Sequence, residues 1–173
     1  MHRHQKARNI MITREAFLKR VRDLRKEEFA ARVDNLKALQ EVFGEQVVEV
    51  ITAQEGRKAE QMWRAIAQQH GRNDIRGIQE TLWKLVVELG VEFTVTETPD
   101  SAQFHVTRCP LAEMARELGE PEWGYVIYCS VDPNIVAGFN PAMGFRRTQT
   151  LMQGHPYCDH FYYMKRVAGE NAS

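Results

Sequence analysis

The first half of the chain repeats apolar residues at every third or fourth position, and charged residues fill most positions between them. This spacing is typical of helices with one buried face. It predicts three helices, over residues 13–42, 45–70 and 74–89. Thr13 and Asp74 are suited to cap a helix start, and Gly44 and Gly71 are suited to end one. The N-terminal half is therefore predicted to be helical.

After Gly90 the period of the pattern changes from about four residues to two, which is typical of strands with one buried face. Two alternating runs, 91–98 and 103–108, flank a Pro-Asp-Ser turn at 99–101. Residues of this kind commonly form tight turns. The two runs are therefore predicted to form a hairpin.

The rest of the chain predicts two helices and two more strands. A short helix begins at Pro110, with Cys109 as its capping residue. An apolar segment over 123–139 predicts a second helix that is broken near Pro133. Two alternating runs follow, over 144–154 and 157–166. The order strand–strand–helix–helix–strand–strand, with short links, favours an antiparallel sheet with helices packed on one face, which is an α+β fold.

A length of 173 residues suits one domain of ordinary size. Residues 1–12 are basic and lack the apolar run of a signal peptide, so we interpret them as a disordered or extended lead-in. A single domain is predicted over 13–168, with a helical part at 13–89 and a sheet-containing part at 90–168.

The composition limits the classes of partner. Hydrophobic residues make up 43% of the chain and charged residues 27%, as in soluble globular proteins. The formal net charge is zero, so no overall field attracts nucleic acid or anionic membranes. No run approaches the roughly 18 apolar residues of a membrane span. We expect a small-molecule substrate, and neither a nucleic-acid nor a membrane partner.

The three cysteines cannot form a closed set of disulfides, so we expect free thiols in a cytoplasmic protein. At a helix N-terminus, the Cys109 thiol would face unpaired N–H groups that favour a thiolate, although it can equally be a small buried residue without a role. Cys129 and Asp132 are three residues apart, on one face of a predicted helix. Asp132 is a candidate general base or substrate anchor, or it merely caps the segment before Pro133.

The last two alternating runs add an acid and an arginine pair. Cys158 and Asp159 are neighbours on a predicted strand, so their side chains are expected on opposite faces. Arg146 and Arg147 alternate in the same way. An arginine on the interior side of a sheet is costly unless it meets an anion, so one of the two is a candidate ligand for a substrate carboxylate.

A metal site is the competing interpretation. Six side chains belong to types that bind zinc or iron: His105, Cys109, Cys129, His155, Cys158 and His160. The chain contains no CxxC, HxxxH or HExxH spacing, and no glycine-rich phosphate loop or GxSxG nucleophile elbow. We expect no cofactor, and the sequence leaves the binding of a metal ion open.

Several short motifs occur together in the second half of the chain. They are Cys109-Pro110, Cys129 with Asp132, Gly138-Phe139-Asn140-Pro141, Arg147-Thr148 with Thr150 and Gly154, and Cys158-Asp159. As a set they resemble the L-2-amino-thiazoline-4-carboxylic acid hydrolase family, and the resemblance covers roughly residues 20–165. It implies a small bacterial enzyme that hydrolyses a cyclic amidine, opening a thiazoline ring to a carbamoyl-cysteine.

Ring opening needs a nucleophile, because the C=N carbon of a cyclic amidine is electrophilic. We expect attack by the thiolate of Cys109 or Cys158, or by a water that Asp132 activates, with Arg147 binding the substrate carboxylate and Asn140 the amidine. The predicted catalytic residues are Cys109, Cys129, Asp132 and Cys158. The predicted substrate-binding residues are Asn140, Arg147, Thr148, Thr150 and Asp159.

Two other functions stay open from the sequence. The same Cys, His and Asp residues could serve a non-catalytic sensor domain that binds a metal or a small ligand. Residues 1–45 hold eleven Lys and Arg against seven Asp and Glu, and the N-terminal helices are a candidate surface for a homo-oligomer or a partner. Because these charges are spread over helix-forming sequence, a solvated helix face is the simpler interpretation.

Overall fold

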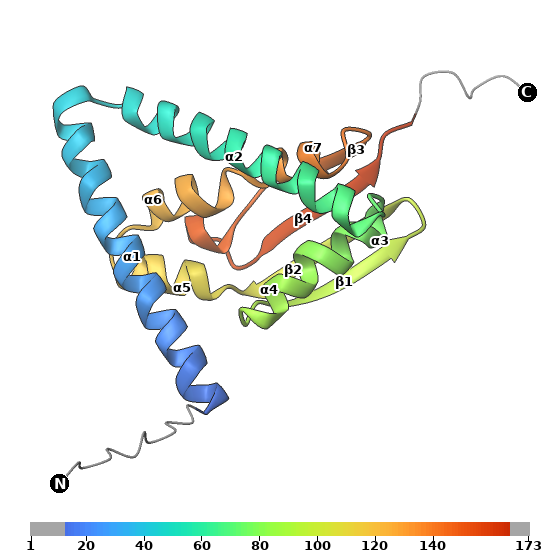
Figure 1. Cartoon of the computed structure of the whole chain (residues 1–173), viewed down its shortest axis with the longest axis horizontal. Helices are drawn as coiled ribbons and strands as arrows, with labels where there is room; N and C mark the ends of the chain where they lie inside the picture. Colours follow the sequence, from blue (N-terminus) through green and yellow to red (C-terminus); the bar gives the residue numbers. More distant parts are fainter. Residues whose placement is uncertain (1–12, 167–173) are drawn as a thin grey trace, which may run out of the picture.

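The structure, a computed structural model, describes residues 13–166 (Figure 1). Its first part is helical and consists of α1 (Arg14–Phe43), α2 (Gln46–His70), α3 (Ile75–Ile78), η1 (Gln79–Trp83) and α4 (Lys84–Glu88). Its second part has four strands, β1 (Glu92–Thr98), β2 (Ser101–Arg108), β3 (Met143–Arg146) and β4 (Cys158–Met164). Between the strands lie α5 (Pro110–Glu117), α6 (Pro121–Gly124), η2 (Tyr125–Cys129), α7 (Asp132–Phe139) and η3 (Leu151–Gln153). The predicted lead-in over 1–12 lies outside the described residues.

The four strands form one antiparallel sheet with the order β1-β2-β4-β3. The hairpin of β1 and β2 makes one side of the sheet, and β4 inserts between β2 and β3. The last strand of the chain is therefore a central one. The start of β4, including Cys158, pairs with β2 alone, and the pairing with β3 begins at Phe161.

One face of the sheet packs against the helices. The residues of β2 that point to this face are buried: Ala102, Phe104 and Val106. On β4, Cys158 lies opposite Val106, and His160 lies opposite Phe104, so both point to the same face. The indole of Trp83 in η1 stacks on the ring of Phe104, with centroids 3.7 Å apart. The site described below lies between these helical turns and the sheet.

The predicted α+β architecture is confirmed, with a helical first half and a four-stranded antiparallel sheet. Thr13 and Asp74 cap α1 and α3, and each accepts a hydrogen bond from a backbone N–H of the first turn. Gly44 and Gly71 end α1 and α2 with positive φ angles, where residues with side chains are disfavoured. The break near Pro133 is also present, because η2 ends and α7 begins just before it.

The sequence also predicts a strand over 144–154, and this prediction is wrong beyond Arg146. The strand β3 stops there, and the chain continues through an irregular loop into the 3-10 turn η3. Leu151 and Met152 are adjacent in sequence and both buried, which the alternating faces of a strand do not allow. The predicted strand is present as far as Arg146, but it does not extend over the loop.

The helices α2 and α7 cross with almost no space between their backbones. Gly138 of α7 lies directly against the backbone of Glu60, so that a Cβ atom at this position would overlap the Glu60 carbonyl oxygen. A second glycine, Gly56 of α2, accommodates the side chain of Asn134 in the same way. This close crossing fixes the position of α7, which begins with Asp132, relative to α2.

We expect Gly138→Ala to lower the free energy of unfolding by roughly 1–3 kcal/mol, because the added methyl group forces two backbones apart. Chemical denaturation followed by circular dichroism would measure the change. Ala137→Ser, at the exposed neighbouring position, is the matched control and should leave stability within about 0.5 kcal/mol. Equal stability of the Gly138 variant and the parent would contradict this close crossing.

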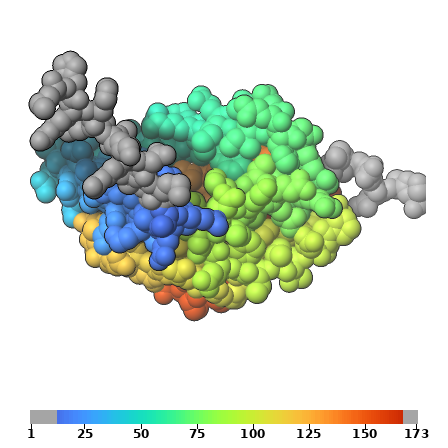
Figure 2. Space-filling view, turned by 60° about the horizontal axis from the view of Figure 1, so that its bottom comes forward, coloured from blue at the N-terminus to red at the C-terminus, as the bar shows by residue number. Residues whose placement is uncertain are grey.

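The long helix α1 is attached to the body by one short apolar stripe. Its buried residues are Phe29, Val33 and Leu36. Figure 2 shows α1 lying across the α5 region, where Lys26 and Glu117 form an ion pair of 2.8 Å. Exposed ion pairs contribute little to stability, so the three buried apolar residues determine where α1 packs. Neither α1 nor any other helix within residues 13–166 is long and apolar enough to cross a membrane.

Candidate active site

Two π-helical turns bring side chains to the same interior region. In η1, Lys84 N–H donates to Gln79 O, and in η2, Ser130 N–H donates to Tyr125 O at 2.8 Å, five residues back in each case. π-helical turns are rare in proteins overall, and those that occur are often found at functional sites. The turn η1 carries Trp83, and η2 carries Tyr125 and Cys129. Two such turns around one region single it out as a candidate site.

The loop after β3 is fixed to β4 by one carboxylate. Asp159 accepts hydrogen bonds from the backbone N–H groups of Thr148 and Gln149 at 2.9 and 2.8 Å, and from the Thr148 hydroxyl at 2.6 Å. Leu151 N–H donates to the sulfur of Cys158 at 3.2 Å. These contacts hold the loop on both sides of β4, because Asp159 and Cys158 point to opposite faces. They leave the side chain of Arg147 turned into the protein.

The guanidinium of Arg147 is the cation of the site, and its side chain is only 7% exposed. It donates to Asp132 Oδ2, to the carbonyl oxygen of Cys129 at 3.1 Å and to the hydroxyl of Tyr125 at 3.4 Å. Burial lowers the pKa of Arg147, and the charge of Asp132 raises it, with a net result above the ordinary value. The sequence predicts that a buried arginine meets an anion. In the structure this anion is the Asp132 carboxylate of the protein itself.

Two side chains approach a single oxygen of Asp132, and only Arg147 donates a hydrogen bond to it. Arg147 and His160 Nε2, the latter at 3.4 Å, both approach Oδ2, and the Asp132 side chain is 16% exposed. Within residues 13–166, no hydrogen bond or ion pair engages the other oxygen, Oδ1. A carboxylate held in this way keeps one oxygen for a water molecule or a ligand. We refer to Tyr125, Asp132, Arg147 and His160 as the buried polar cluster.

The three cysteines belong to the packed interior. Cys158 is buried in the core, Cys109 and Cys129 pack against the core, and the carbonyl oxygen of Cys129 accepts from Arg147. Burial is the largest cause that raises the pKa of each thiol, well above its ordinary value for Cys129 and to about 11 for Cys158. Backbone N–H groups at the start of α5 lower the pKa of Cys109, but burial outweighs them. Burial therefore opposes the thiolate that the sequence predicts at Cys109, and the catalytic role of this residue stays a prediction.

The other predicted binding residues serve the framework in this structure. Asn140 donates to Asn73 O and accepts from Ala142 N–H, both at 2.8 Å, and it is 8% exposed. Thr150 is buried and caps η3 through its hydroxyl. Thr148 and Asp159 hold the loop, as described above. Contacts to a substrate by these residues stay predictions.

Sequence reasoning missed three members of the site. His160 entered only as a candidate metal ligand, although it is two residues from Cys158 on a strand and so shares its face. Its Nδ1 atom and the Nε1 atom of Trp83 are buried without a hydrogen-bond partner in the described part of the chain. Tyr125 gave no sequence signal, because it lies within an apolar run.

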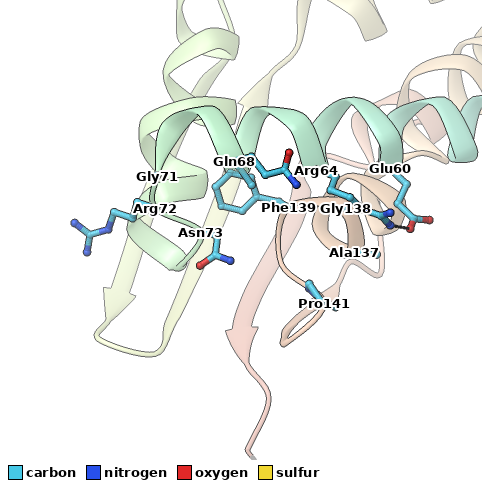
Figure 3. Close-up of a pocket in the computed structure, with 11 residues that line it drawn as sticks. Glu60, Arg64, Gln68, Gly71, Arg72, Asn73, Ala137, Gly138, Phe139 and Pro141 are labelled. Atoms are coloured by element: carbon cyan, nitrogen blue, oxygen red, sulfur yellow. Dashed lines mark hydrogen bonds and ion pairs between the residues drawn. The ribbon is translucent and has the colours of Figure 1, made fainter.

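Two hollows on the surface of the described residues lie near these elements, and neither of the two is lined by a cysteine. The larger, of about 640 Å³, lies between the end of α2 and the end of α7 (Figure 3). Its charged side chains Arg64 and Arg72 are engaged with Glu60 and Asp74. It contains no member of the buried polar cluster.

The second hollow, of about 590 Å³, borders the cluster through one residue. It is lined by Arg116, Pro121, Glu122, Tyr125, Val126, Met152, Gln153 and Gly154. Tyr125 lines this hollow and its hydroxyl contacts Arg147 from the other side. This side chain therefore lies between the solvent-facing hollow and the Arg147–Asp132 pair.

A metal centre finds no support in the geometry. Among residues 13–166, no three His, Cys, Asp or Glu side chains are arranged to hold a metal ion. His105 stacks on Tyr157, and its register partner is Asp159, so it lies on the face of the sheet away from the helices. The candidate ligands of the sequence are thus divided between the two faces.

Comparison with known proteins assigns the family. The profile of the L-2-amino-thiazoline-4-carboxylic acid hydrolase family matches residues 12–162, which is most of the chain. The chain belongs to this family. The resemblance inferred from the sequence motifs is confirmed. No curated protein matches the chain at a significant level.

Two solved structures have a similar fold. The phenol-responsive sensory domain of the transcription activator PoxR, solved with phenol, aligns over 79% of this chain and 74% of its own, with a TM-score of 0.51 and 13% identity. A trafficking protein particle complex subunit 3 from Naegleria fowleri, covalently bound to palmitic acid, aligns over 86% and 98%, with a TM-score of 0.51 and 11% identity. At these identities the likeness shows the fold alone.

Proposed function

We propose that the protein is a hydrolase that opens a small cyclic amidine, such as L-2-amino-thiazoline-4-carboxylate, with a water molecule that Asp132 activates. The single observation that carries this proposal is the Asp132 carboxylate, which is held at Oδ2 by Arg147 and His160 and keeps Oδ1 unengaged within residues 13–166. The family assignment supports hydrolysis of this substrate class. A cytoplasmic location is part of the same proposal.

The proposed reaction is an addition followed by a ring opening. Asp132 Oδ1 takes a proton from water, and the hydroxide adds to the carbon that carries both ring and exocyclic nitrogen. Asp132 passes this first proton to the ring nitrogen, which the addition has made basic. Asp132 then takes the hydroxyl proton of the adduct and passes it to the same nitrogen as the ring C–N bond breaks, so that the nitrogen leaves as an amine and the carbon becomes the carbonyl of a carbamoyl group. Asp132 ends the cycle as a carboxylate, so no oxidant or further reactant is needed.

Water is a better nucleophile here than a thiol of this protein. A thiolate is the reactive form of cysteine, and burial raises the pKa of all three thiols. The sulfur of Cys158 additionally accepts a hydrogen bond from Leu151, which gives it a structural role. We assign the cysteines to the lining of the site and the proton transfer to Asp132.

The substrate approaches through the hollow that Tyr125 lines. Arg147 already shares its charge with Asp132, so a substrate carboxylate needs a further cation. Arg116 lines the same hollow and has no ion-pair partner within residues 13–166, which makes it a suitable ligand for that carboxylate. Tyr125 would then move or turn to let the ring reach Asp132.

Turnover of L-2-amino-thiazoline-4-carboxylate by the purified protein, with product detected by chromatography, tests the proposal. We expect ring opening by the parent protein, and we expect Cys109→Ser, Cys129→Ser and Cys158→Ser each to keep activity within about tenfold. A loss of 10²-fold or more in one of these folded variants would show that a thiol attacks, since removing a nucleophile has effects of at least this size.

Alkylation of the native protein provides an independent check on the thiols. Because the pKa of Cys158 is raised to about 11, its reaction with iodoacetamide at pH 8 should be slow and should accelerate as the pH approaches this value. The unfolded protein is the control, in which all three cysteines should react rapidly. Fast labelling of a native cysteine at pH 7 would contradict the assignment of the thiols to the lining.

A non-catalytic small-ligand domain is the second candidate. The observation that favours it is the pair of buried nitrogens without partners, Trp83 Nε1 and His160 Nδ1, which a bound polar group could satisfy. The two proteins of similar fold were also solved with ligands, one with phenol and one with covalently bound palmitic acid. Saturable binding of a thiazoline carboxylate without turnover would favour this function over hydrolysis.

A further inference from the structure

We propose that a second copy of this chain packs on α1, with the two α1 helices antiparallel across a two-fold axis. With 30 residues, α1 is the longest helix of the described chain, and Figure 1 shows it at one edge of the molecule with the rest of the body on one side of it. Its buried residues are only three, Phe29, Val33 and Leu36. The opposite surface of α1 is therefore available to a partner. Such a dimer is independent of the proposed ring-opening reaction.

This opposite surface of α1 carries a second line of apolar residues. Intervals of four and three residues place six of them along one seam of the helix, and we call them the outer stripe: Phe17, Val21, Leu24, Ala31, Ala38 and Val42. At about 100° per residue, the centre of the outer stripe lies roughly 140° around the helix from the centre of the buried residues. An apolar seam with this spacing is typical of a helix that packs against another helix.

The outer stripe is exposed to solvent in the isolated chain. Phe17 is 58% exposed, Leu24 46% and Val42 73%. Single exposed apolar side chains are normal in soluble proteins, but five of the eleven large ones in the described chain lie on this one helix, since Leu39 and Phe43 are exposed as well. Covering such a line of apolar surface is favourable, because it removes the surface from water.

The charges of α1 indicate that the partner is its own copy, in the antiparallel direction. Residues 14–26 hold six Lys and Arg against two Asp and Glu, whereas residues 33–45 hold one Lys against three Asp and Glu. That lysine, Lys37, is already paired with Glu120. Parallel packing would bring the two basic ends together. Antiparallel packing brings each basic end to an acidic one, and the two-fold axis makes this match twice.

A single register satisfies both the stripe and the charges. With the two-fold axis beside residues 29 and 30, Phe17 of one copy lies against Val42 of the other, and Val21 lies against Ala38. Large side chains thus meet smaller ones along the seam, as interdigitated packing requires. In the same register, residues 14–26 of one copy lie along residues 33–45 of the other. The contact extends over about 40 Å of helix.

Two polar residues interrupt the seam near its centre. Glu28 and Asn35 occupy the remaining positions of the four-and-three spacing, and the Asn35 side chain donates to Ala31 O of its own helix at 2.9 Å. Polar residues at such positions fix the register of paired helices at a cost in stability. We therefore expect a weak dimer, with a dissociation constant on the order of micromolar.

Sedimentation velocity of the full chain tests for this dimer. Between about 1 and 100 µM, a range that includes such dissociation constants, the parent should pass from monomer to dimer. Leu24→Glu and Val42→Glu should each raise the dissociation constant at least about tenfold, because each places a charge in an apolar contact that the two-fold axis repeats. The matched control is Met62→Glu, at a position of α2 that is 56% exposed, and it should leave the dissociation constant unchanged.

An exchange of charges tests the direction of packing. In the antiparallel register Arg20 lies beside Glu41 of the second copy. Arg20→Glu and Glu41→Arg should each weaken the dimer by about three- to tenfold, and both changes on one chain should restore the parent value within about twofold. In a parallel dimer each residue would meet its own copy, so the single changes would have little effect.

Three results would overturn the proposal. A parent protein that stays monomeric at about 100 µM would show that something other than a second copy covers the outer stripe. A dimer that is unaffected by Leu24→Glu and Val42→Glu would have its interface elsewhere. A dimer that these two variants weaken, but that the exchange of charges at positions 20 and 41 does not restore, would exclude the antiparallel arrangement. Circular dichroism of each variant verifies that it is folded, which is expected because all five positions are outside the core.

Discussion

Replacing Arg147 by methionine is expected to lower the free energy of unfolding by about 3–5 kcal/mol, the typical result when one partner of a buried ion pair is removed. The Arg147 side chain is 7% exposed, and its guanidinium is the permanent positive charge in contact with Asp132 within residues 13–166. Methionine fills most of the volume but leaves the carboxylate without its cation. Urea denaturation of the parent and the variant measures the difference.

A double-mutant cycle separates the charge from the packing. Asp132→Leu combined with Arg147→Met removes both charges, and replacing a buried pair by apolar residues is often close to neutral. We therefore expect the double variant to be more stable than Arg147→Met alone. The matched control is Arg146→Met, because Arg146 is exposed and lies over the ring of Phe161 on the other face. If the two arginine variants lose the same small amount, the buried pair contributes no stability of its own.

Asp132→Asn is expected to lower kcat for ring opening by 10²- to 10⁴-fold, the usual range for the loss of a general base. The side-chain amide has the same shape and can still accept from Arg147, so the variant should fold, but it cannot take a proton from water. Steady-state turnover of the thiazoline carboxylate measures the effect. KM should change much less than kcat, since Asp132 acts on the water and Arg116 is proposed to hold the substrate.

The control for this variant is Asp100→Asn, an exposed residue of the turn between β1 and β2. Its activity should equal that of the parent. Activity of Asp132→Asn within threefold of the parent, in a variant shown to be folded, would remove Asp132 from the reaction. A parallel loss in stability and activity would instead point to a framework role, and the double-mutant cycle above measures the stability part separately.

Much of the fold follows from local pattern. The caps at Thr13 and Asp74 and the period change after Gly90 depend on neighbouring residues, so they can be predicted from the sequence. The predicted pairing of Asp132 with a thiol-rich region is also local, since Cys129 is three residues away. These features need no knowledge of what lies across the core.

The rest of the site depends on contacts between distant segments. The loop that carries Arg147 looks like a strand in sequence, and only the three hydrogen bonds to Asp159 show why it leaves the sheet. The capping position that favours a Cys109 thiolate is local and visible in the sequence, whereas the burial that raises the pKa of this thiol comes from other parts of the chain. His160 meets Asp132 across the core, which no spacing along the chain reveals.

The two π-helical turns have a consequence for how this chain tolerates length changes. Each turn accommodates one residue more than the α-helical bond pattern would over the same span, as the bond from Ser130 N–H to Tyr125 O shows. Deleting a single residue from η2 would let the helix become regular. It would also rotate every side chain before the deletion by about 100° relative to those after it, so that Tyr125 would leave Arg147. A shortened homologue could thus gain regular hydrogen bonding and lose the chemistry, and alignments of such chains should be checked for a gap at this position.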